Sequence, residues 1–261
     1  MNKKAPIINI LVFLVIGIIL INFNLVFNLF SASISTYLIP NINSIYEELS
    51  ININPWSKAI LWTFGMSTLS LFLSLIIGVS VGYISSYFRL AAIDLWAKLL
   101  WSIPLIAIST YLALIVGLNW AYGVTLSVFL SFYPIEKHVF NYCSTRSDGI
   151  NSIAASFALT KWQEYLYLRL NGSIRSMGTS LAQSIPLCFV GETMAEFSTG
   201  KMSDYSIGLG GMLRKASSYS NYTQLWLSII LMMLLVFMSS LSIQLIWNIK
   251  FPQNNEGDAL Q

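Results

Sequence analysis

The stretch that organises the chain is NSIAASFALTKWQEYLYLRL, residues 151–170, which lies between two strongly apolar segments without being a membrane span itself. On a helix, Ala158, Trp162, Tyr165 and Arg169 would share one face, because they follow the spacing i, i+4, i+7 and i+11. Small residues let another surface approach the backbone closely, and the aromatic rings add apolar contact area. The pattern suits a docking helix for a soluble partner and, equally, an amphipathic helix that rests on lipid headgroups.

Composition places the chain in a membrane. Of its 261 residues 56% are apolar and only 10% are charged, whereas a soluble domain is about a quarter charged. We therefore expect one transmembrane domain covering residues 1–261. The net charge of +3 gives no indication of a nucleic-acid partner. Cys143, Cys188 and the single histidine, His138, lack the spacing of metal ligands, so no metal site is expected.

The apolar runs predict an all-α membrane protein with about six transmembrane helices. The predicted spans are residues 7–30, 56–88, 95–117, 123–142, 176–197 and 222–247. The first run could instead be a signal peptide, because a small-residue Ser-Ala-Ser sequence follows it, but its length favours an uncleaved span. A short surface helix is expected near residues 45–51. The GxxxG pattern at residues 78–82 is compatible with close helix packing and equally with chance.

The distribution of positive charges predicts the orientation. If both termini lie in the cytoplasm, ten of the 14 Lys and Arg residues fall at or near the inner face. This agrees with the positive-inside rule. The loop at residues 143–172, which contains the docking segment, is then cytoplasmic, and its partner would be a cytosolic protein.

Three residues inside the predicted spans are candidates for lining a central pathway: Pro104, Pro186 and Glu192. A proline within a span frees a carbonyl that needs another partner, and a carboxyl group there needs protein or water to face. Ordinary core packing is the alternative for each. Glu196 is expected nearer the outer boundary, where water would solvate it. Residues 208–211, Gly-Leu-Gly-Gly, predict a turn into a short re-entrant or surface helix rather than a phosphate-binding loop.

The docking segment resembles a cytoplasmic motif, E-x-A-x-x-x-G-A-S-x-W-Q-x-F-x-x-V-x-L-P. The residues at the corresponding positions include Ala154, Ala158, Trp162, Gln163, Tyr165, Leu168 and Leu170. Ala195-Glu196 followed by Gly208-Leu209-Gly210 is similar to a second pattern, A-E-M followed by G-L-G. Both patterns are typical of the inner-membrane permease subunits of bacterial ABC importers, in the branch that serves sulfonates, taurine and nitrate. The resemblance covers roughly residues 38–250.

The chain departs from that motif at three positions. Ser152 stands in place of the acidic residue, Ala158 in place of the glycine and Asn171 in place of the proline. An alanine restricts the backbone at a bend where glycine is free, and an asparagine gives up the fixed φ of proline while still tolerating a turn. The departures leave docking sterically reasonable, with a diverged partner or weaker coupling as the consequence to test.

The resemblance implies a type I ABC importer permease with the docking segment acting as its coupling helix. It assigns contact with a cytosolic ATPase dimer to Ala154, Ala155, Ala158, Trp162 and Gln163. It also implies a second permease copy or a paralogue, a periplasmic or lipid-anchored solute-binding protein, and surrounding membrane lipid. Because the chain has no Walker A sequence, ATP and Mg²⁺ are expected on the ATPase, and the chain itself would be neither an enzyme nor a cofactor carrier.

Other functions remain open from the sequence. A stand-alone secondary transporter would normally show an inverted repeat and coupling carboxylates in mid-span, and only Glu192 fits. A membrane-embedded enzyme and a channel have less support. The cargo would be a small solute of the sulfonate, taurine or nitrate kind, or a vitamin precursor; a lining carboxylate at Glu192 favours a neutral or cationic solute over an anion.

Overall fold

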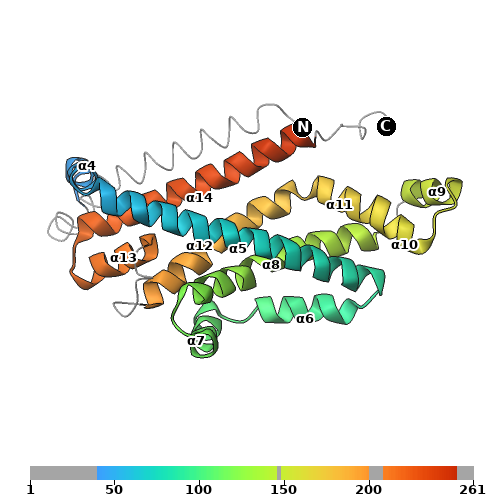
Figure 1. Ribbon diagram of the computed structural model, residues 1–261, viewed down its shortest axis with the longest axis horizontal. Coiled ribbons are helices and arrows are strands. Elements are labelled where there is room, and N and C mark those ends of the chain that lie inside the picture. Colours follow the sequence, from blue (N-terminus) through green and yellow to red (C-terminus); the bar gives the residue numbers. More distant parts are fainter. Residues whose placement is uncertain (1–39, 146–147, 200–207, 252–261) are drawn as a thin grey trace, which may run out of the picture.

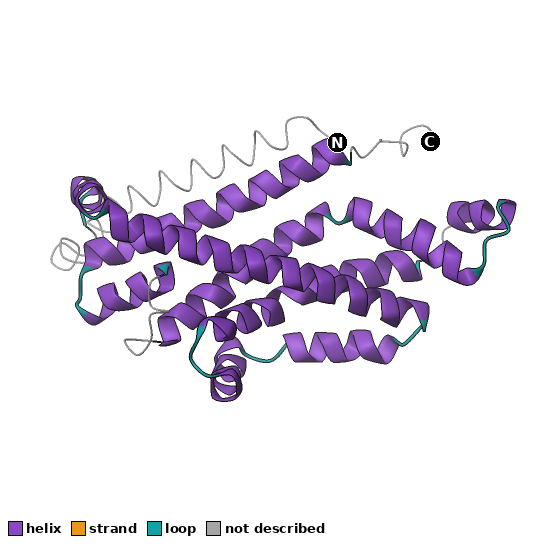
Figure 2. Ribbon diagram, in the orientation of Figure 1, coloured by secondary structure: helices purple, strands orange, loops and turns teal. Residues whose placement is uncertain are grey.

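A computed structural model of the chain describes residues 40–145, 148–199 and 208–251, and every regular element within these ranges is a helix (Figure 2). The elements are α4 (Ile42–Ile51), α5 (Ile53–Tyr87), α6 (Ala91–Trp101), α7 (Leu105–Val116), α8 (Trp120–Ser144), α9 (Asp148–Ser156), α10 (Lys161–Gln163), the π-helix η1 (Glu164–Leu170), α11 (Asn171–Ser176), α12 (Gly178–Thr199), α13 (Leu209–Ser218) and α14 (Tyr222–Lys250). The expectation of an all-α protein is confirmed for these residues.

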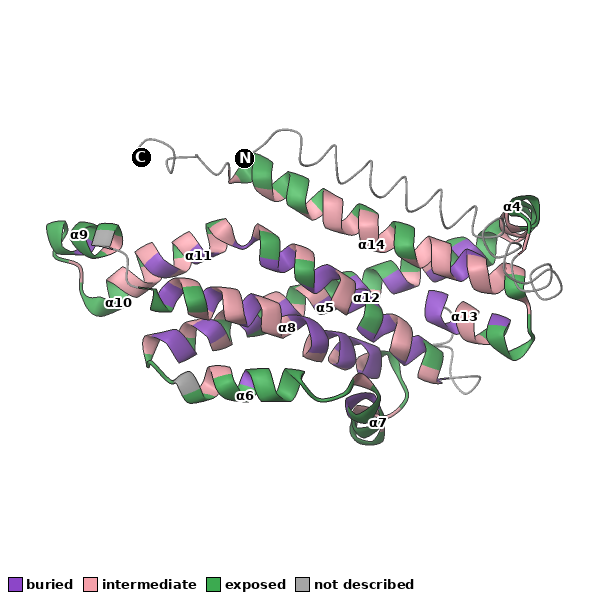
Figure 3. Ribbon diagram, turned by 180° about the vertical axis from the view of Figure 1, so that it is seen from behind, coloured by how far each residue is buried: buried purple, intermediate pink, exposed green. Residues whose placement is uncertain are grey.

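The long helices form an elongated bundle with α8 at its centre. Helix α8 packs along α5 and α12, while α14 lies against α12 and α13 (Figure 1). Buried residues concentrate where α5, α8 and α12 meet, and α6 and α14 keep largely exposed surfaces (Figure 3). The two ends of the bundle differ: α4 and α13 lie at one, and the short helix α9 projects from the other (Figure 1).

Glycines allow α8 to approach its neighbours closely. A Cβ at Gly78 would lie 2.8 Å from the carbonyl oxygen of Phe132, and one at Gly82 would lie 2.7 Å from that of Glu136. The GxxxG pattern of α5 is therefore a packing surface, because any side chain there would push the two backbones apart. On the other side of α8, a Cβ at Gly191 of α12 would meet the backbone of Ser127.

The predicted third span, residues 95–117, is a bent pair of helices. Helices α6 and α7 meet at 95°, and Pro104 stands immediately before α7 as its N-cap. A second proline, Pro134, lies inside α8 and leaves the carbonyl of Leu130 without its helical partner. The indole Nε1 of Trp101 donates to that carbonyl at 2.9 Å, so the end of α6 satisfies the group that the proline frees.

Two described helices, α5 and α14, are long and apolar enough to cross a membrane, and the α6–α7 pair makes a third if the bent pair counts as one span. Helices α8 and α12 occupy the predicted fourth and fifth spans, but they lie inside the bundle and carry many buried polar side chains. Their composition is consequently less apolar than that of the outer helices. The predicted first span, residues 7–30, lies outside the described residues, and the number of six spans stays a prediction.

The docking segment is not the single helix that its periodicity predicts. Its first helix, α9, ends at Ser156; the chain then turns and continues through α10 and η1. Ala158 has φ of +47°, and the N–H groups of Ala158 and Leu159 donate to the carbonyls of Ala155 and Ala154. This is a Schellman ending with alanine in the left-handed position that glycine normally takes. Ala158 therefore does not share a continuous helical face with Trp162, Tyr165 and Arg169.

Candidate coupling site

An aromatic cluster seats the docking segment on the end of α5. The rings of Tyr83 and Tyr87 lie 5.9 and 5.5 Å from that of Trp162, edge to face. Tyr165 packs on the same two tyrosines at 6.4 and 5.2 Å, and its hydroxyl donates to the carbonyl of Ser86 at 3.4 Å. Such edge-to-face pairs stabilise by about 0.5–1.5 kcal/mol each beyond the apolar area that they bury. The segment is thus held by its own aromatic residues.

Arg169 ties the same segment to the end of α8. Its side chain is buried, and its Nη1 donates to the carbonyls of Cys143 and Thr145, each at 2.9 Å. Nε donates to Glu164 at 2.7 Å, and Nη2 donates to the side-chain oxygen of Asn151 at 3.2 Å while pairing with Glu164 at 2.6 Å. All three nitrogens of the guanidinium therefore have a partner. One residue joins α8, α9 and η1, so movement of any one of them is carried to the others.

The five residues predicted to contact an ATPase differ in how far they are exposed. Trp162 is half exposed but packs within the aromatic cluster. Ala154 is buried, whereas Ala155 and Ala158 are exposed. Gln163 is exposed and completes a capping box with Thr160, in which each side chain receives the backbone N–H of the other. Whether any of these residues touches a partner stays a prediction.

Two exposed apolar side chains of the segment were missed by sequence reasoning. Phe157 is 74% exposed and Ile153 is 46% exposed. Both lie at the projecting tip that α9 forms (Figure 1). A helical-face argument over residues 151–170 hides them, because it assumes a continuous helix where the chain turns. We refer to Ile153, Ala155 and Phe157 as the tip surface.

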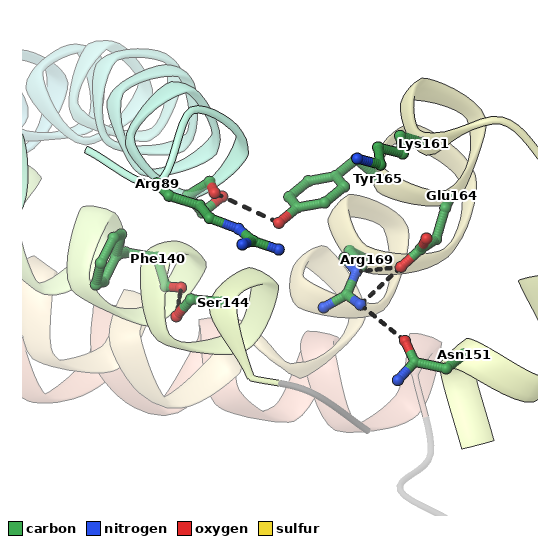
Figure 4. Close-up of a pocket in the computed structure, with 9 residues that line it drawn as sticks. Arg89, Phe140, Ser144, Asn151, Lys161, Glu164, Tyr165 and Arg169 are labelled. Atoms are coloured by element: carbon green, nitrogen blue, oxygen red, sulfur yellow. Dashed lines mark hydrogen bonds and ion pairs between the residues drawn. The ribbon is translucent and has the colours of Figure 1, made fainter. Parts of the chain in front are cut away.

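An open pocket of about 550 Å³ lies between the segment and the ends of α5 and α8. Arg89, Lys161 and Arg169 line it together with a single carboxylate, Glu164. Figure 4 shows the Arg89 guanidinium pointing into the space across from Arg169, which its bonds to Glu164 and Asn151 hold in place. The end of the bundle that carries α9 therefore combines an apolar tip with a positively charged recess.

The opposite end of the bundle carries a closed hydrogen-bond network around Glu196. Its carboxylate accepts from the hydroxyl of Thr63 at 2.8 Å and from the backbone N–H of Gly210 at 2.7 Å. The Thr63 oxygen in turn accepts from the N–H of Leu209 at 2.9 Å. Glu196 thus caps the N-terminus of α13, where free N–H groups favour a negative charge. The expectation that water solvates Glu196 is wrong, because the side chain is fully buried.

The same network explains the glycines around it. A Cβ at Gly208 would overlap the Glu196 carboxylate, and one at Gly210 would overlap the carbonyl oxygen of Thr193. The spacing of Ala-Glu and Gly-Leu-Gly in the sequence therefore encodes a contact between α12 and α13. The periodicity of the chain alone could not show it, because the partner, Thr63, comes from α5.

The three pathway candidates lie in different surroundings. Glu192 is fully buried in α12. Pro186 is half-buried in the same helix, and Pro104 is exposed at the bend between α6 and α7. Among the described residues, Pro104 therefore lies at the surface and Glu192 in the interior. Their role in a pathway stays a prediction that depends on a second subunit.

Residues 74–249 match the family model described as binding-protein-dependent transport system inner membrane component. The match extends from within α5 to the end of α14 and includes the docking segment, Glu196 and the start of α13, whereas Thr63 lies before it. The chain belongs to this family. No curated protein matches the sequence.

Membership makes the chain a permease component of an ABC transport system in the membrane. The family match does not identify the cargo or the branch within the family.

Proposed function

We propose that the chain is the permease subunit of an ATP-driven importer and that residues 148–176 form its coupling segment on the cytoplasmic side. One observation carries the proposal: the segment is braced on the inner ends of α5 and α8 by Tyr165 and Arg169, while its tip surface stays uncovered. A transmission element needs both properties. It must grip the transport helices firmly and leave apolar surface for a moving partner.

The partner that fits the tip surface is a cytosolic ATPase with an apolar groove. Phe157 and Ile153 would enter the groove as anchors, since large apolar side chains dominate the binding energy of such interfaces. ATP and Mg²⁺ belong to that ATPase. Rotation of two ATPase subunits would displace the tip. Because Arg169 donates to the carbonyls of Cys143 and Thr145, this displacement would also move the end of α8.

The remaining partners follow from the architecture of an importer. A second copy of this chain, or a paralogous permease, would close the pathway against Pro104, Pro186 and Glu192. A periplasmic or lipid-anchored binding protein would deliver the solute at the end that carries α4 and α13. Six spans with both termini in the cytoplasm, in the inner membrane of a bacterium, complete the arrangement.

The proposed cargo is a small solute of the sulfonate, taurine and nitrate branch, or a vitamin precursor. Resemblance to the branch motifs supports the first class. The buried carboxyl of Glu192 supports a neutral or cationic solute instead, because an anion beside it would need a compensating cation. Measuring which small molecules raise the melting temperature of the associated binding protein would decide between them.

Association with the ATPase tests the function directly. Phe157→Glu places a charge at the tip without touching the aromatic cluster, so we expect the ATPase to be lost while the melting temperature of the permease stays unchanged. Tyr46→Glu is the matched control, because Tyr46 is 71% exposed on α4 at the other end of the bundle. Co-purification that survives Phe157→Glu together with Ile153→Glu would contradict the proposal.

Labelling gives an independent test of the orientation. The only two cysteines of the chain, Cys143 and Cys188, are both buried. Ala155→Cys and Tyr46→Cys should therefore give clean reactions with a maleimide that cannot cross membranes. We expect the first to react only from the cytoplasmic side and the second only from outside. The reverse result would exclude an ATPase at α9 and favour the alternative of a stand-alone secondary transporter.

A further inference from the structure

We propose that the pocket between α5, α8 and η1 binds the phosphate of an anionic phospholipid headgroup. Three cations, Arg89, Lys161 and Arg169, line the pocket against one carboxylate, Glu164. The recess therefore carries an excess of two positive charges. Its volume of about 550 Å³ is within the range of small-molecule sites.

The cations divide into a fixed one and two available ones. All three guanidinium nitrogens of Arg169 are engaged by Glu164, Asn151 and the end of α8, so this residue contributes mainly its charge to the pocket. Arg89 and Lys161 are exposed and form no ion pair with any residue in the described ranges. Figure 4 shows the Arg89 side chain extended into the pocket. These two residues would make the direct contacts with a phosphate.

The surface beside the pocket indicates a lipid as the source of the phosphate. Arg89 follows the end of α5, where Ile84, Phe88 and Leu90 are 45%, 62% and 45% exposed. Apolar side chains next to a basic recess at the inner end of a transmembrane helix can hold acyl chains and a headgroup together. A free phosphate would use the cations but gain nothing from these three residues.

Binding there would join two parts of the molecule. Arg89 belongs to the end of α5 and Lys161 opens α10, and a headgroup held by both would add a bridge beside the aromatic cluster. The lipid would thus fix the coupling segment against α5. The inference rests on the proposed placement of this end at the inner membrane surface, but it does not depend on the docking of an ATPase.

Lipid retention measured by native mass spectrometry on the purified full-length permease tests the site. Dioleoylphosphatidylglycerol should bind at least tenfold more tightly than dioleoylphosphatidylcholine. Arg89→Gln with Lys161→Gln should abolish that preference. Lys98→Gln with Lys250→Gln removes the same charge from two exposed positions outside the pocket and should leave it intact. An unchanged preference in the first pair would overturn the proposal.

Two further arms separate the remaining explanations. Arg89→Gly removes the cation at a residue whose φ is +53°, so it should weaken lipid binding several-fold while the melting temperature in detergent stays level or rises. Inorganic phosphate at millimolar concentration should not displace the phosphatidylglycerol; full displacement would show a site for free phosphate. Loss of ATPase binding in the Arg89 and Lys161 variants with unaltered lipid retention would assign the pocket to the protein interface and exclude the lipid.

Discussion

The two ends of this permease are built on opposite principles. At the end that carries α13, which is the outer end in the proposed orientation, Glu196, Thr63 and the first N–H groups of α13 form a buried network in which each group has a partner inside the protein. At the end that carries α9, the proposed inner end, Arg169 is equally well bonded, yet it supports a tip with Phe157 exposed and a pocket with two available cations. The outer end is thus satisfied within the chain, whereas the inner end offers a rigid surface to a partner.

The largest expected effect tests how tightly the residues of the Glu196 network are packed. In Gly210→Ala the added methyl meets the Thr193 carbonyl and the Glu196 side chain, and backbone cannot move aside as a flexible side chain can. Overpacking of this kind should lower the stability of the permease by about 3 kcal/mol. Thermal unfolding in detergent would measure it.

The matched control is Gly65→Ala in α5, where the added methyl would meet nothing within 4 Å. Alanine is the better helix former, so this variant should gain about 0.5–1 kcal/mol. Equal losses in both variants would mean that the α12–α13 contact is looser than its geometry indicates.

The next effect concerns the inner brace. Arg169→Met keeps much of the apolar volume but leaves Glu164 and the carbonyls of Cys143 and Thr145 without their donor. We expect a loss of about 2–3 kcal/mol, confined to the segment rather than spread over the bundle. Hydrogen exchange should accelerate in residues 148–176 and remain slow in α12.

Arg169→Lys serves as the control for charge. A lysine cannot reproduce the fork of five donors that spans α8, α9 and η1, so it should behave like the methionine variant. Wild-type protection in Arg169→Lys would show that charge alone, and not the geometry of the guanidinium, holds the segment in place.

The sequence predicts the fold class and the family better than the local structure. The low charge and the long apolar runs were sufficient to predict a helical membrane protein. The family was indicated by the Trp162-Gln163 pair and by the Ala-Glu and Gly-Leu-Gly patterns. The break of the docking segment was not predictable from its periodicity, because helical spacing on both sides of Ala158 is compatible with one helix or with two. A left-handed alanine leaves no compositional signal.

The burial of Glu196 in α12 also could not be predicted from the local sequence. Glu196 lies near the end of its apolar run, where solvation is the simplest expectation, but Thr63 and Gly210 approach it from α5 and α13. A contact between residues 133 positions apart cannot be read from one local pattern. The Gly208 and Gly210 pair could have provided a signal, because glycines next to a helix start indicate a close approach.

A smaller effect distinguishes the network from ordinary packing at the outer end. Thr63→Val keeps the shape but removes the donor to Glu196 and the acceptor for the Leu209 N–H. Because these buried groups would lose their hydrogen-bond partners, the free energy of unfolding should fall by about 2 kcal/mol. Thr68→Val, on an exposed face of the same helix where the hydroxyl only bonds back to Phe64, should be nearly neutral. Similar melting temperatures for the two variants would reject the network as a source of stability.

The smallest expected effect is a gain in stability from a glycine substitution at each end of the bundle. It tests whether the two ends differ in their backbone conformation or only in their side chains. Ala158 at the inner end and Ser220 at the outer end both have positive φ, +47° and +52°, after a helix that ends in the same hydrogen-bond pattern. Replacing either residue by glycine should stabilise its helix end by about 1 kcal/mol, since glycine takes this conformation freely. Chemical unfolding in mixed micelles would compare them. A gain in stability at Ser220 but a loss at Ala158 would mean that the Ala158 methyl makes a contact of its own. The departure from glycine in the coupling motif would then be compensated within this chain.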